Sequence, residues 1–410
     1  MPQLLPILLR KELESLQVLE QSVPQKEEIT SKSTQDPASL TRGKDNAPFR
    51  KLLSVWPWKA KNRGNKQQAE VSLLESKLPL FSYETLAKAT DNFHPENKIA
   101  NCGFGTVYKG ILFNGQEIAV KVLLNSATGM INEFTNKVEA TSKLQHCNVI
   151  RLLGCCAERE LNMLVLEYMP NKSLDICLFD PEKRDVLDWS RRASIIQGIA
   201  RGLLYLHRNS RLKIIHRDLK LSNILLDREL NPKISDFGLA RILESNQVMD
   251  VTWRVVGTFG YMAPEYALDG IFSEKSDIFS YGVLLLEIVS GKSNSGFLRE
   301  WHYTLNLIGH AWKLWNDNET MQLVDPSCSS ESFETEISKY LHVGLLCVQD
   351  SSTERPDMST VISMLCGEIA ELPRPKLRLG LRVGLSETEF PQHRGDYSVD
   401  DFSITTVDGR

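Results

Sequence analysis

The stretch His216-Arg217-Asp218-Leu219-Lys220-Leu221-Ser222-Asn223 places a carboxylate, an ammonium group and an amide within one short loop. Phosphoryl transfer needs a carboxylate beside the attacking hydroxyl and a cation on the moving phosphoryl group. We therefore expect Asp218 to orient the hydroxyl and take its proton. Lys220 is expected to neutralise the γ-phosphate. The stretch is typical of a loop that carries phosphoryl-transfer chemistry.

A second motif, Asp236-Phe237-Gly238, follows after a short strand-like segment. Mg²⁺ prefers oxygen ligands, which carboxylates and amides supply. Asn223 and Asp236 are therefore predicted to hold the metal, with Asp236 bridging it to the β- and γ-phosphates. The structural alternative is an ordinary basic loop with a turn at Phe237-Gly238. That alternative does not account for both motifs in this order.

Upstream, Glu117-Ile118-Ala119-Val120-Lys121 reads as an alternating strand that ends in a lysine. Ala119 is small enough for an adenine ring to lie against it, and Lys121 would reach the α- and β-phosphates. Alternating strands with one lysine are common, so this motif indicates a function only together with the two motifs that follow it in the sequence.

Downstream, the sequence contains Ala263-Pro264-Glu265, then Asp277 and, much later, Arg355. Glu265 and Arg355 are predicted to form a buried ion pair. Asp277 is predicted to hold the backbone of the catalytic loop through hydrogen bonds. Each of these residues could instead be a surface charge, but their order after Asp236 favours the structural roles.

The composition is that of a soluble globular protein. The chain has 410 residues, of which 42% are hydrophobic and 24% charged, with a net charge of −4. These values argue against wholesale disorder and against nucleic acid as a partner. The eight cysteines are scattered without a Cys-x-x-Cys pair, which argues against a zinc site or a disulfide framework. No apolar run reaches the roughly 18 residues that a membrane-spanning helix needs.

Residues 1–78 form a polar leader that we expect to be disordered or weakly structured. Within it, residues 42–66 are rich in Lys and Arg, with Trp56 and Trp58 between them. Basic residues mixed with tryptophan can dock on an anionic membrane surface. The alternative is a solvated linker, and both readings stay open.

The rest of the chain divides into a strand-rich part, a helical part and a tail. Residues 79–168 predict the small lobe, 169–372 the large lobe, and 373–410 a polar tail. Strands are expected at 98–100, 106–113, 117–124, 149–155 and 162–168, and helices at 130–144, 189–209, 275–290, 304–316 and 335–349. This pattern predicts an α+β fold of two lobes with a cleft between them.

Residues 81–372 resemble the intracellular kinase domain of plant receptor-like serine/threonine kinases, notably the S-locus lectin-type and cysteine-rich receptor-like groups. The likeness rests on the segments FSYETLAKATDNF (81–93), YMPNKSL (168–174), SEKSD (273–277) and TTVDGR (405–410), besides the motifs above. It implies the two-lobed protein kinase fold, ATP and Mg²⁺ as cofactors, and Ser/Thr side chains of proteins as substrates in receptor-kinase signalling.

The same resemblance implies a set of ATP contacts, in which backbone groups of Glu167 and Met169 bind adenine and Leu166 is the gatekeeper. The expected ATP-binding residues are Ile99, Ala100, Cys102, Gly103, Gly105, Val107, Ala119, Lys121, Glu167 and Met169.

The resemblance also bears on the acceptor and on regulation. Lys220 beside Asp218 favours serine and threonine over tyrosine as the acceptor. Arg217 before Asp218 implies phosphorylation of the activation loop, with Thr252 and Thr258 as candidates. A phosphate there could pair with Arg217 and order the loop.

The glycine loop departs from the family pattern G-x-G-x-x-G. Here it reads Ala100-Asn101-Cys102-Gly103-Phe104-Gly105, so two of the three glycines are replaced. Glycine lets backbone amides approach a phosphate closely. We expect Cys102 to place a side chain over the phosphates and weaken ATP binding.

Two further departures lie at the helix expected over 130–144. When the sequence is aligned without gaps to the family pattern, Lys137 falls where the family has the glutamate that pairs with Lys121. Two like charges about 4 Å apart repel by about 4 kcal/mol at an effective dielectric near 20. We hypothesise that Glu133, one helical turn earlier, takes the role of that glutamate; the alternative is that Lys137 turns to solvent. Thr141 replaces an apolar residue and needs a polar partner.

Two functions follow from these observations. The first is an active protein kinase with weakened activity, because the residues expected to touch phosphate and metal are present. The second is a pseudokinase scaffold that regulates an active receptor-like kinase. The chain lacks the ectodomain and spanning helix of its relatives, so we expect a cytoplasmic form with peripheral contact to the plasma membrane through 42–66.

Overall fold

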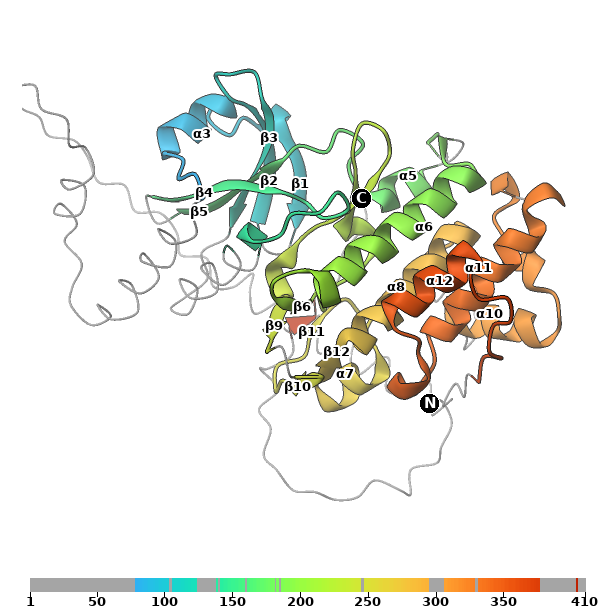
Figure 1. Cartoon of the computed structure of the whole chain (residues 1–410). Helices are drawn as coiled ribbons and strands as arrows, with labels where there is room; N and C mark the ends of the chain where they lie inside the picture. Colours follow the sequence, from blue (N-terminus) through green and yellow to red (C-terminus); the bar gives the residue numbers. More distant parts are fainter. Residues whose placement is uncertain are drawn as a thin grey trace, which may run out of the picture. The chain divides into compact units, whose positions relative to one another are not determined.

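The computed structural model describes most of the chain from residue 78 to residue 376, with a short strand near the C-terminus (Figure 1). The described ranges are 78–102, 105–123, 138, 141–158, 161–180, 182–183, 186–244, 247–294, 306–328, 331–376 and 403–404. All of them belong to one unit, Lys61–Arg410. The leader, its basic segment 42–66 and the tail, apart from 373–376 and 403–404, lie outside these ranges.

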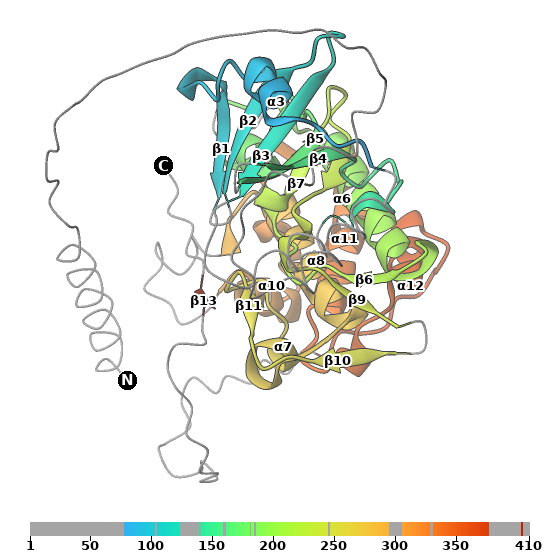
Figure 2. The same ribbon diagram turned by 90° about the vertical axis from the view of Figure 1, so that its left-hand side faces the viewer.

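The small lobe is a five-stranded antiparallel sheet. Its strands, in spatial order, are β1 (Lys98–Cys102), β2 (Gly105–Ile111), β3 (Glu117–Leu123), β5 (Leu161–Glu167) and β4 (Leu152–Glu158). Helix α3 (Tyr83–Ala89) packs on this sheet, as Figures 1 and 2 show. The five predicted strands are present, which confirms the β-rich lobe.

One predicted strand boundary is wrong, because Val149 and Ile150 do not belong to β4. Instead, Ile150 N–H donates to the carbonyl of Ile234 at 2.9 Å, and Ile234 N–H donates to the carbonyl of Asn148 at 2.9 Å. These backbone groups join the chain to a strand of the large lobe, so β4 begins only at Leu152.

Strand β3 lies in the middle of the sheet, and its side chains from Ile118 to Lys121 are buried. The register places Ala119 opposite Leu166 and Lys121 opposite Leu164 on β5. Because side chains alternate along a strand, Ala119 and Lys121 share one face. The predicted adenine and phosphate contacts therefore lie on the same side of the sheet.

The large lobe is mainly helical. Its helices are α5 (Leu174–Phe179), α6 (Trp189–Leu204), α7 (Pro264–Asp269), α8 (Glu274–Ser290), α10 (Leu307–Asn316), α11 (Glu334–Cys347) and α12 (Met358–Cys366). A π-helical turn at Tyr205–Asn209 continues α6, so the predicted helix 189–209 is present in two parts. Together with the sheet, these helices confirm the two-lobed α+β fold. Of the predicted helix 130–144, only a few residues at its C-terminal end are described.

Helix α8 is at the centre of this lobe, and α6, α10 and α11 pack against it. Every residue of α8 except Lys275 is buried. Because it is buried on almost every side, α8 is surrounded by the other elements of the lobe. Its N-terminus is fixed by a capping box, in which Ser273 Oγ accepts from Lys275 N–H and Ser276 Oγ accepts from Ser273 N–H.

Short strand pairs hold the segment that carries the motifs. The pairs are β6 (Lys213–Ile215) with β9 (Arg241–Leu243), β7 (Ile224–Leu226) with β8 (Pro232–Ile234), β10 (Met249–Val251) with β12 (Ile271–Ser273), and β11 (Val256–Gly257) with β13 (Ser403–Ile404). The loop from β6 to β7 carries Asp218, and the loop from β8 to β9 carries Asp236. Among the helices in the described ranges, none combines the length and the apolar character needed to cross a bilayer.

Candidate active site

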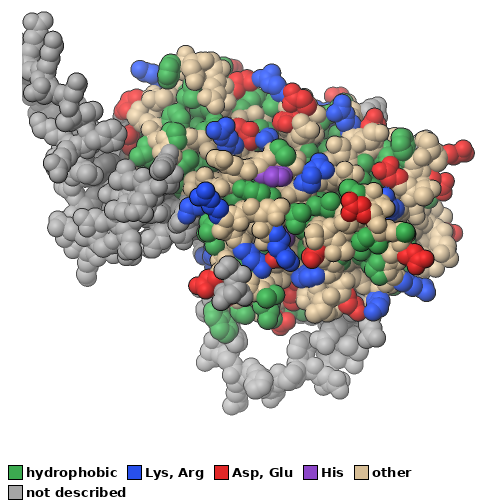
Figure 3. Space-filling view, viewed as in Figure 1, with side chains coloured by type: hydrophobic (Ala, Val, Ile, Leu, Met, Phe, Trp, Pro, Cys, Tyr) green, Lys and Arg blue, Asp and Glu red, His purple; other side chains and the backbone are tan. Residues whose placement is uncertain are grey.

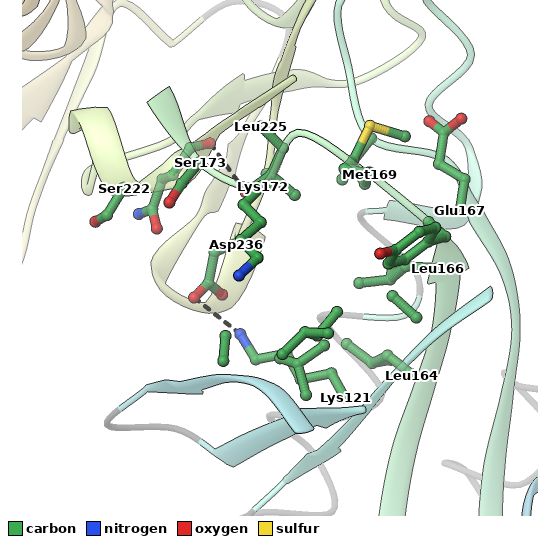
Figure 4. Close-up of a pocket in the computed structure, with 18 of the residues that line it drawn as sticks. Lys121, Leu164, Leu166, Glu167, Met169, Lys172, Ser173, Ser222, Leu225 and Asp236 are labelled. Atoms are coloured by element: carbon green, nitrogen blue, oxygen red, sulfur yellow. Dashed lines mark hydrogen bonds and ion pairs between the residues drawn. The ribbon is translucent and has the colours of Figure 1, made fainter. Parts of the chain in front are cut away.

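A cavity of about 200 Å³ lies between the strands β1–β3 and the loops that follow β6 and β8 (Figure 4). Apolar side chains from both lobes form most of its wall. Its lining residues are Ile99, Ala100, Val107, Ala119, Lys121, Leu123, Thr141, Ile150, Leu164, Leu166, Glu167, Tyr168, Met169, Lys172, Ser173, Ile176, Ser222, Asn223, Leu225, Ser235, Asp236, Phe237 and Gly238.

Most of the residues expected to bind ATP line this cavity. The structure brings together Ile99, Ala100, Val107, Ala119, Lys121, Glu167 and Met169. The carboxylate of Glu167 points away from the cavity (Figure 4), accepting from Arg151 N–H at 2.8 Å and from Lys233 Nζ at 3.1 Å. Any contact of Glu167 with adenine therefore falls to its backbone.

The glycine loop is described only in part. Gly103 and the side chain of Cys102 lie outside the described residues. Gly105 does not line the cavity; it begins β2 with φ of +152°. A Cβ on Gly105 would lie 2.1 Å from the carbonyl oxygen of Val122, so the close approach of β3 requires glycine here.

An ion pair between a buried lysine and a half-buried aspartate crosses the cavity from one lobe to the other. Lys121 Nζ lies 2.8 Å from Asp236 Oδ2, and both side chains point into the cavity (Figure 4). Asp236 adopts a left-handed backbone with φ of +60°, and its Oδ1 accepts from Gly238 N–H at 3.3 Å. The turn at Phe237-Gly238 thus aims the carboxylate at the lysine.

The amide of Asn223 is held beside Asp218. Its Nδ2 donates to the carbonyl oxygen of Asp218 at 2.8 Å and to Asp218 Oδ2 at 3.1 Å. Because the amide nitrogen faces Asp218, the amide oxygen faces the other way. Asn223 and Asp236 both line the cavity, so an amide oxygen and a carboxylate are available there, and this donor set fits Mg²⁺.

Asp218 binds a threonine hydroxyl. Thr258 Oγ1 donates to Asp218 Oδ1 at 2.7 Å, while Lys220 Nζ donates to Thr258 Oγ1 at 2.8 Å. Lys220 Nζ also lies 3.5 Å from Asp218 Oδ2. Thr258, expected to be a phosphorylation candidate, therefore contacts the predicted catalytic carboxylate and lysine. Because Thr258 lies far from Asp218 in the sequence, no local pattern predicted this contact.

Arg217 contacts neither threonine expected to carry a phosphate. Its Nε donates to the hydroxyl of Tyr266 at 3.1 Å, and its guanidinium lies 4.7 Å from the ring centre of Phe272. Burial lowers the pKa of Arg217, although Tyr266 acts in the opposite direction. The hydroxyl of Thr252 donates to the carbonyl of Arg254 at 3.1 Å.

Asp277, in the first turn of α8, holds the catalytic loop from below. Its carboxylate accepts from the backbone N–H groups of His216 at 2.8 Å and Arg217 at 2.9 Å, and its Oδ2 lies 3.0 Å from His207 Nε2. Burial raises the pKa of Asp277, but the hydrogen bond and charge of His207 and the contacts of His216 outweigh it. The net result is a pKa below the usual value.

The remaining predicted positions have different outcomes. Arg355 and Glu265 form a two-fold ion pair, with Nη1–Oε1 at 2.7 Å and Nη2–Oε2 at 2.8 Å. Thr141 is buried and lines the cavity. Lys137 and Glu133 lie outside the described residues, so their proposed exchange of roles stays a prediction.

Sequence reasoning missed several lining residues of the large lobe. Leu225 lies on β7, two residues after Asn223, which ends the preceding helical turn. Lys172 and Ser173 follow the strand β5 in a turn where Lys172 has φ of +59°. No periodicity in the sequence indicates the direction of side chains in such a turn.

Comparison with known sequences identifies a protein family that this chain matches. The sequence model described as "Protein tyrosine and serine/threonine kinase" matches residues 93–365. That match contains every motif that lines or supports the cavity from Ile99 to Arg355.

Relatives from Arabidopsis thaliana match over a longer range. One G-type lectin S-receptor-like serine/threonine-protein kinase is 56% identical over 335 residues, and so is the similar kinase SD1-13. The receptor-like serine/threonine-protein kinase SD1-7 is 49% identical over 342 residues. In each case the match covers 81% of this chain and 40% of the relative. The chain therefore spans about two fifths of the length of these curated relatives.

Proposed function

The chain belongs to the protein tyrosine and serine/threonine kinase family, and from this premise we propose that it transfers the γ-phosphate of ATP to serine and threonine hydroxyls of proteins. We place this activity in receptor-kinase signalling, because the relatives are named receptor-like serine/threonine-protein kinases. The pseudokinase scaffold is not favoured, since both the family and the relatives are named as kinases.

The observation that carries the proposal is the convergence of phosphate-handling groups on one cavity. Lys121, Asn223 and Asp236 line it, and Asn223 is hydrogen-bonded to Asp218. A cation, two carboxylates and an amide therefore lie within one small volume. These are the groups that phosphoryl transfer needs for charge stabilisation and positioning.

In this arrangement Lys121 would bind the α- and β-phosphates after separating from Asp236. Asn223 and Asp236 would hold Mg²⁺, which supplies charge neutralisation for the phosphates when bound. Asp218 would accept the proton of the attacking hydroxyl, and Lys220 would stabilise the charge on the transferred group. The names of the relatives support serine and threonine as acceptors, because they are described as serine/threonine-protein kinases.

Asp218→Asn tests the proposal. Purified protein is incubated with labelled ATP, Mg²⁺ and a generic Ser/Thr substrate, and label on the substrate is measured. The variant keeps the hydrogen-bonding shape but cannot accept the proton, so we expect a loss of at least about a hundredfold in rate. The exposed carboxylate Asp317→Asn is the matched control. Folded wild-type protein that transfers no label would overturn the proposal.

The finer assignments also stay proposals. We propose a receptor-like kinase as a partner, because the relatives are named receptor-like kinases. We also propose that the protein acts in the cytoplasm, with association to the plasma membrane. Peripheral membrane contact through 42–66 concerns residues outside the described part of the chain. Co-sedimentation with phosphatidylserine vesicles, before and after Lys59 and Lys61 are changed to Gln, tests that contact.

A further inference from the structure

A second cavity lies in the large lobe, where three segments of the chain meet. Its volume is about 780 Å³, and it shares no lining residue with the first cavity. We call it the basic pocket. It is lined by His207, Arg208, Ser210, Arg211, Leu212, Lys213, Ile242, Leu243, Glu244, Gln247, Val248, Ser273, Glu274 and Lys275.

Positive charge dominates the wall of the basic pocket. Four cationic side chains face two carboxylates, namely Arg208, Arg211, Lys213 and Lys275 against Glu244 and Glu274. In Figure 3, blue side chains gather on the face where Figure 1 shows β6 and β9. Arg211 is exposed, and in the described part of the chain it makes no ion pair. The pocket is therefore suited to an anion.

One carboxylate positions two of these cations. Glu274 is 8% exposed and accepts from Lys213 Nζ at 2.7 Å and from Arg208 Nε at 3.0 Å. An arginine has five N–H donors and a lysine has three. Arg208 uses one of its donors on Glu274. Lys213 uses one donor on Glu274 and a second on the backbone carbonyl of Gln247. Each cation thus keeps at least one N–H for a ligand.

A buried histidine adds an unpartnered nitrogen to the same wall. The side chain of His207 is 1% exposed, its Nε2 is bonded to Asp277, and its Nδ1 has no hydrogen-bond partner among the described residues. The carboxylate of Asp277 can only accept, so Nε2 is the donor in that bond.

The start of α8 lies at the same pocket. Ser273 is its N-cap, and Glu274 and Lys275 are in its first turn. The N-terminus of a helix carries partial positive charge and favours anions. The first turn of a helix and cations with unused donors therefore line one cavity, together with the buried His207.

We propose that the basic pocket binds the phosphoryl group of a phosphorylated serine or threonine side chain. The pocket is concave and of the size that small groups occupy in proteins. Its two carboxylates, Glu244 and Glu274, would repel an extended polyanion such as a nucleic acid or a flat anionic membrane. A single phosphoryl group can instead bind at Arg211, which makes no ion pair with a carboxylate in the described part of the chain.

The phosphoryl group has two possible sources, namely a serine of this chain and a serine of another protein. Glu244, Gln247 and Val248 belong to the segment between Asp236 and Ala263, and Ser245 follows Glu244 directly in the sequence. Ser245 itself lies outside the described residues, but its sequence neighbour Glu244 lines the pocket, so a phosphate on Ser245 would be covalently tethered to a lining residue. That source rests on the proposed kinase activity, whereas a phosphoserine on another protein does not.

Fluorescence anisotropy with a labelled peptide that carries one phosphoserine between neutral residues tests the site. We expect Arg211→Gln to weaken binding about tenfold and Arg211→Lys to keep most of it, because charge-assisted hydrogen bonds to phosphate are strong. The exposed Arg374→Gln is the matched control. Wild-type affinity in the double variant Arg208→Gln/Arg211→Gln, or equal affinity for the unphosphorylated peptide, would overturn the proposal.

A second arm separates the sources. Wild type and Ser245→Ala are incubated with ATP and Mg²⁺, and phosphate incorporation is mapped by mass spectrometry before the peptide is added. If phosphate on Ser245 fills the pocket, the treated wild type loses peptide binding and Ser245→Ala keeps it. Binding kept by both supports a phosphoserine on another protein. Absence of any incorporation counts against the kinase activity alone, because peptide binding needs no catalysis.

Discussion

At the scale of single residues, the contact between Thr258 and Asp218 changes the expected role of that threonine. A phosphate on Thr258 would place negative charge against the Asp218 carboxylate and break two hydrogen bonds. We infer that the hydroxyl of Thr258 serves to position Asp218 and Lys220. Thr252, whose hydroxyl bonds only the backbone near it among the described contacts, stays the candidate for phosphorylation.

Thr258→Val removes the hydroxyl and keeps the shape of the side chain. We expect kcat to fall roughly tenfold to a hundredfold, because a hydrogen bond to a charged group contributes about 1.5–3 kcal/mol. KM for ATP should change little, since Thr258 does not line the cavity. Steady-state kinetics measure both values, and Thr258→Ser should restore kcat. A valine variant with the kcat of the wild type would contradict this role.

At the scale of elements, one buried arginine links α7 to distant parts of the large lobe. Arg355 has a fully buried side chain and bonds both carboxylate oxygens of Glu265, at the start of α7. It also donates to the backbone carbonyls of Lys275, Gln349 and Asp350. The ion pair thus links the segment after the activation loop to α8 and to the chain after α11.

Arg355→Met should destabilise the protein by about 3–5 kcal/mol, because it leaves a carboxylate and several carbonyls without their donor. Urea unfolding measures the free energy. The exposed pair of Lys183 with Asp180 offers a matched control, and Lys183→Met should cost less than about 1 kcal/mol. Equal losses of unfolding free energy in the two variants would contradict a larger contribution from the buried pair.

The periodicity of the sequence predicts most of the long elements but few of the short ones. Alternation located the five strands of the small lobe, and apolar spacing located α6, α8, α10 and α11. It failed at Val149, where the partner strand lies in the other lobe. The strands β6 to β12 have two or three residues each, too few to show any period.

At the scale of the whole molecule, the dependence of stability on pH should reflect one buried acid. Glu287 is fully buried on α8, and burial raises its pKa to about 8 from an ordinary value of 4.5. Hydrogen bonds from Asn294 N–H and from the hydroxyl of Tyr261 oppose the rise in part. The folded protein therefore holds a proton that the unfolded chain releases.

The sign follows from this difference in proton binding. The contribution of Glu287 to stability is complete below pH 4.5 and is lost as the pH rises through about 8. Urea unfolding between pH 5 and pH 8 should show the wild type losing stability relative to Glu287→Gln by up to about 1.4 kcal/mol per pH unit. The exposed Glu319→Gln should follow the wild type. Parallel curves for wild type and Glu287→Gln would refute this assignment.

The active site was predictable as a set of residues but not as a set of contacts. The motifs placed Lys121, Asn223 and Asp236 in one site because their chemistry is complementary, and all three line one cavity. The sequence did not reveal the hydroxyl of Thr258, nor the partner of Arg217. Both contacts depend on how the activation segment returns to the catalytic loop, and long-range loop geometry leaves no local pattern.

The burial of α8 has a consequence for the lifetime of the catalytic geometry. The carboxylate of Asp277 holds the catalytic loop, and its helix is covered by protein along nearly its whole length. Backbone amides in such a helix exchange with deuterium only when the surrounding lobe opens as a cooperative unit. Transient opening of the activation segment would therefore leave Asp277, which holds the catalytic loop, in place. The catalytic loop and the slowest-exchanging core should accordingly persist and disappear together.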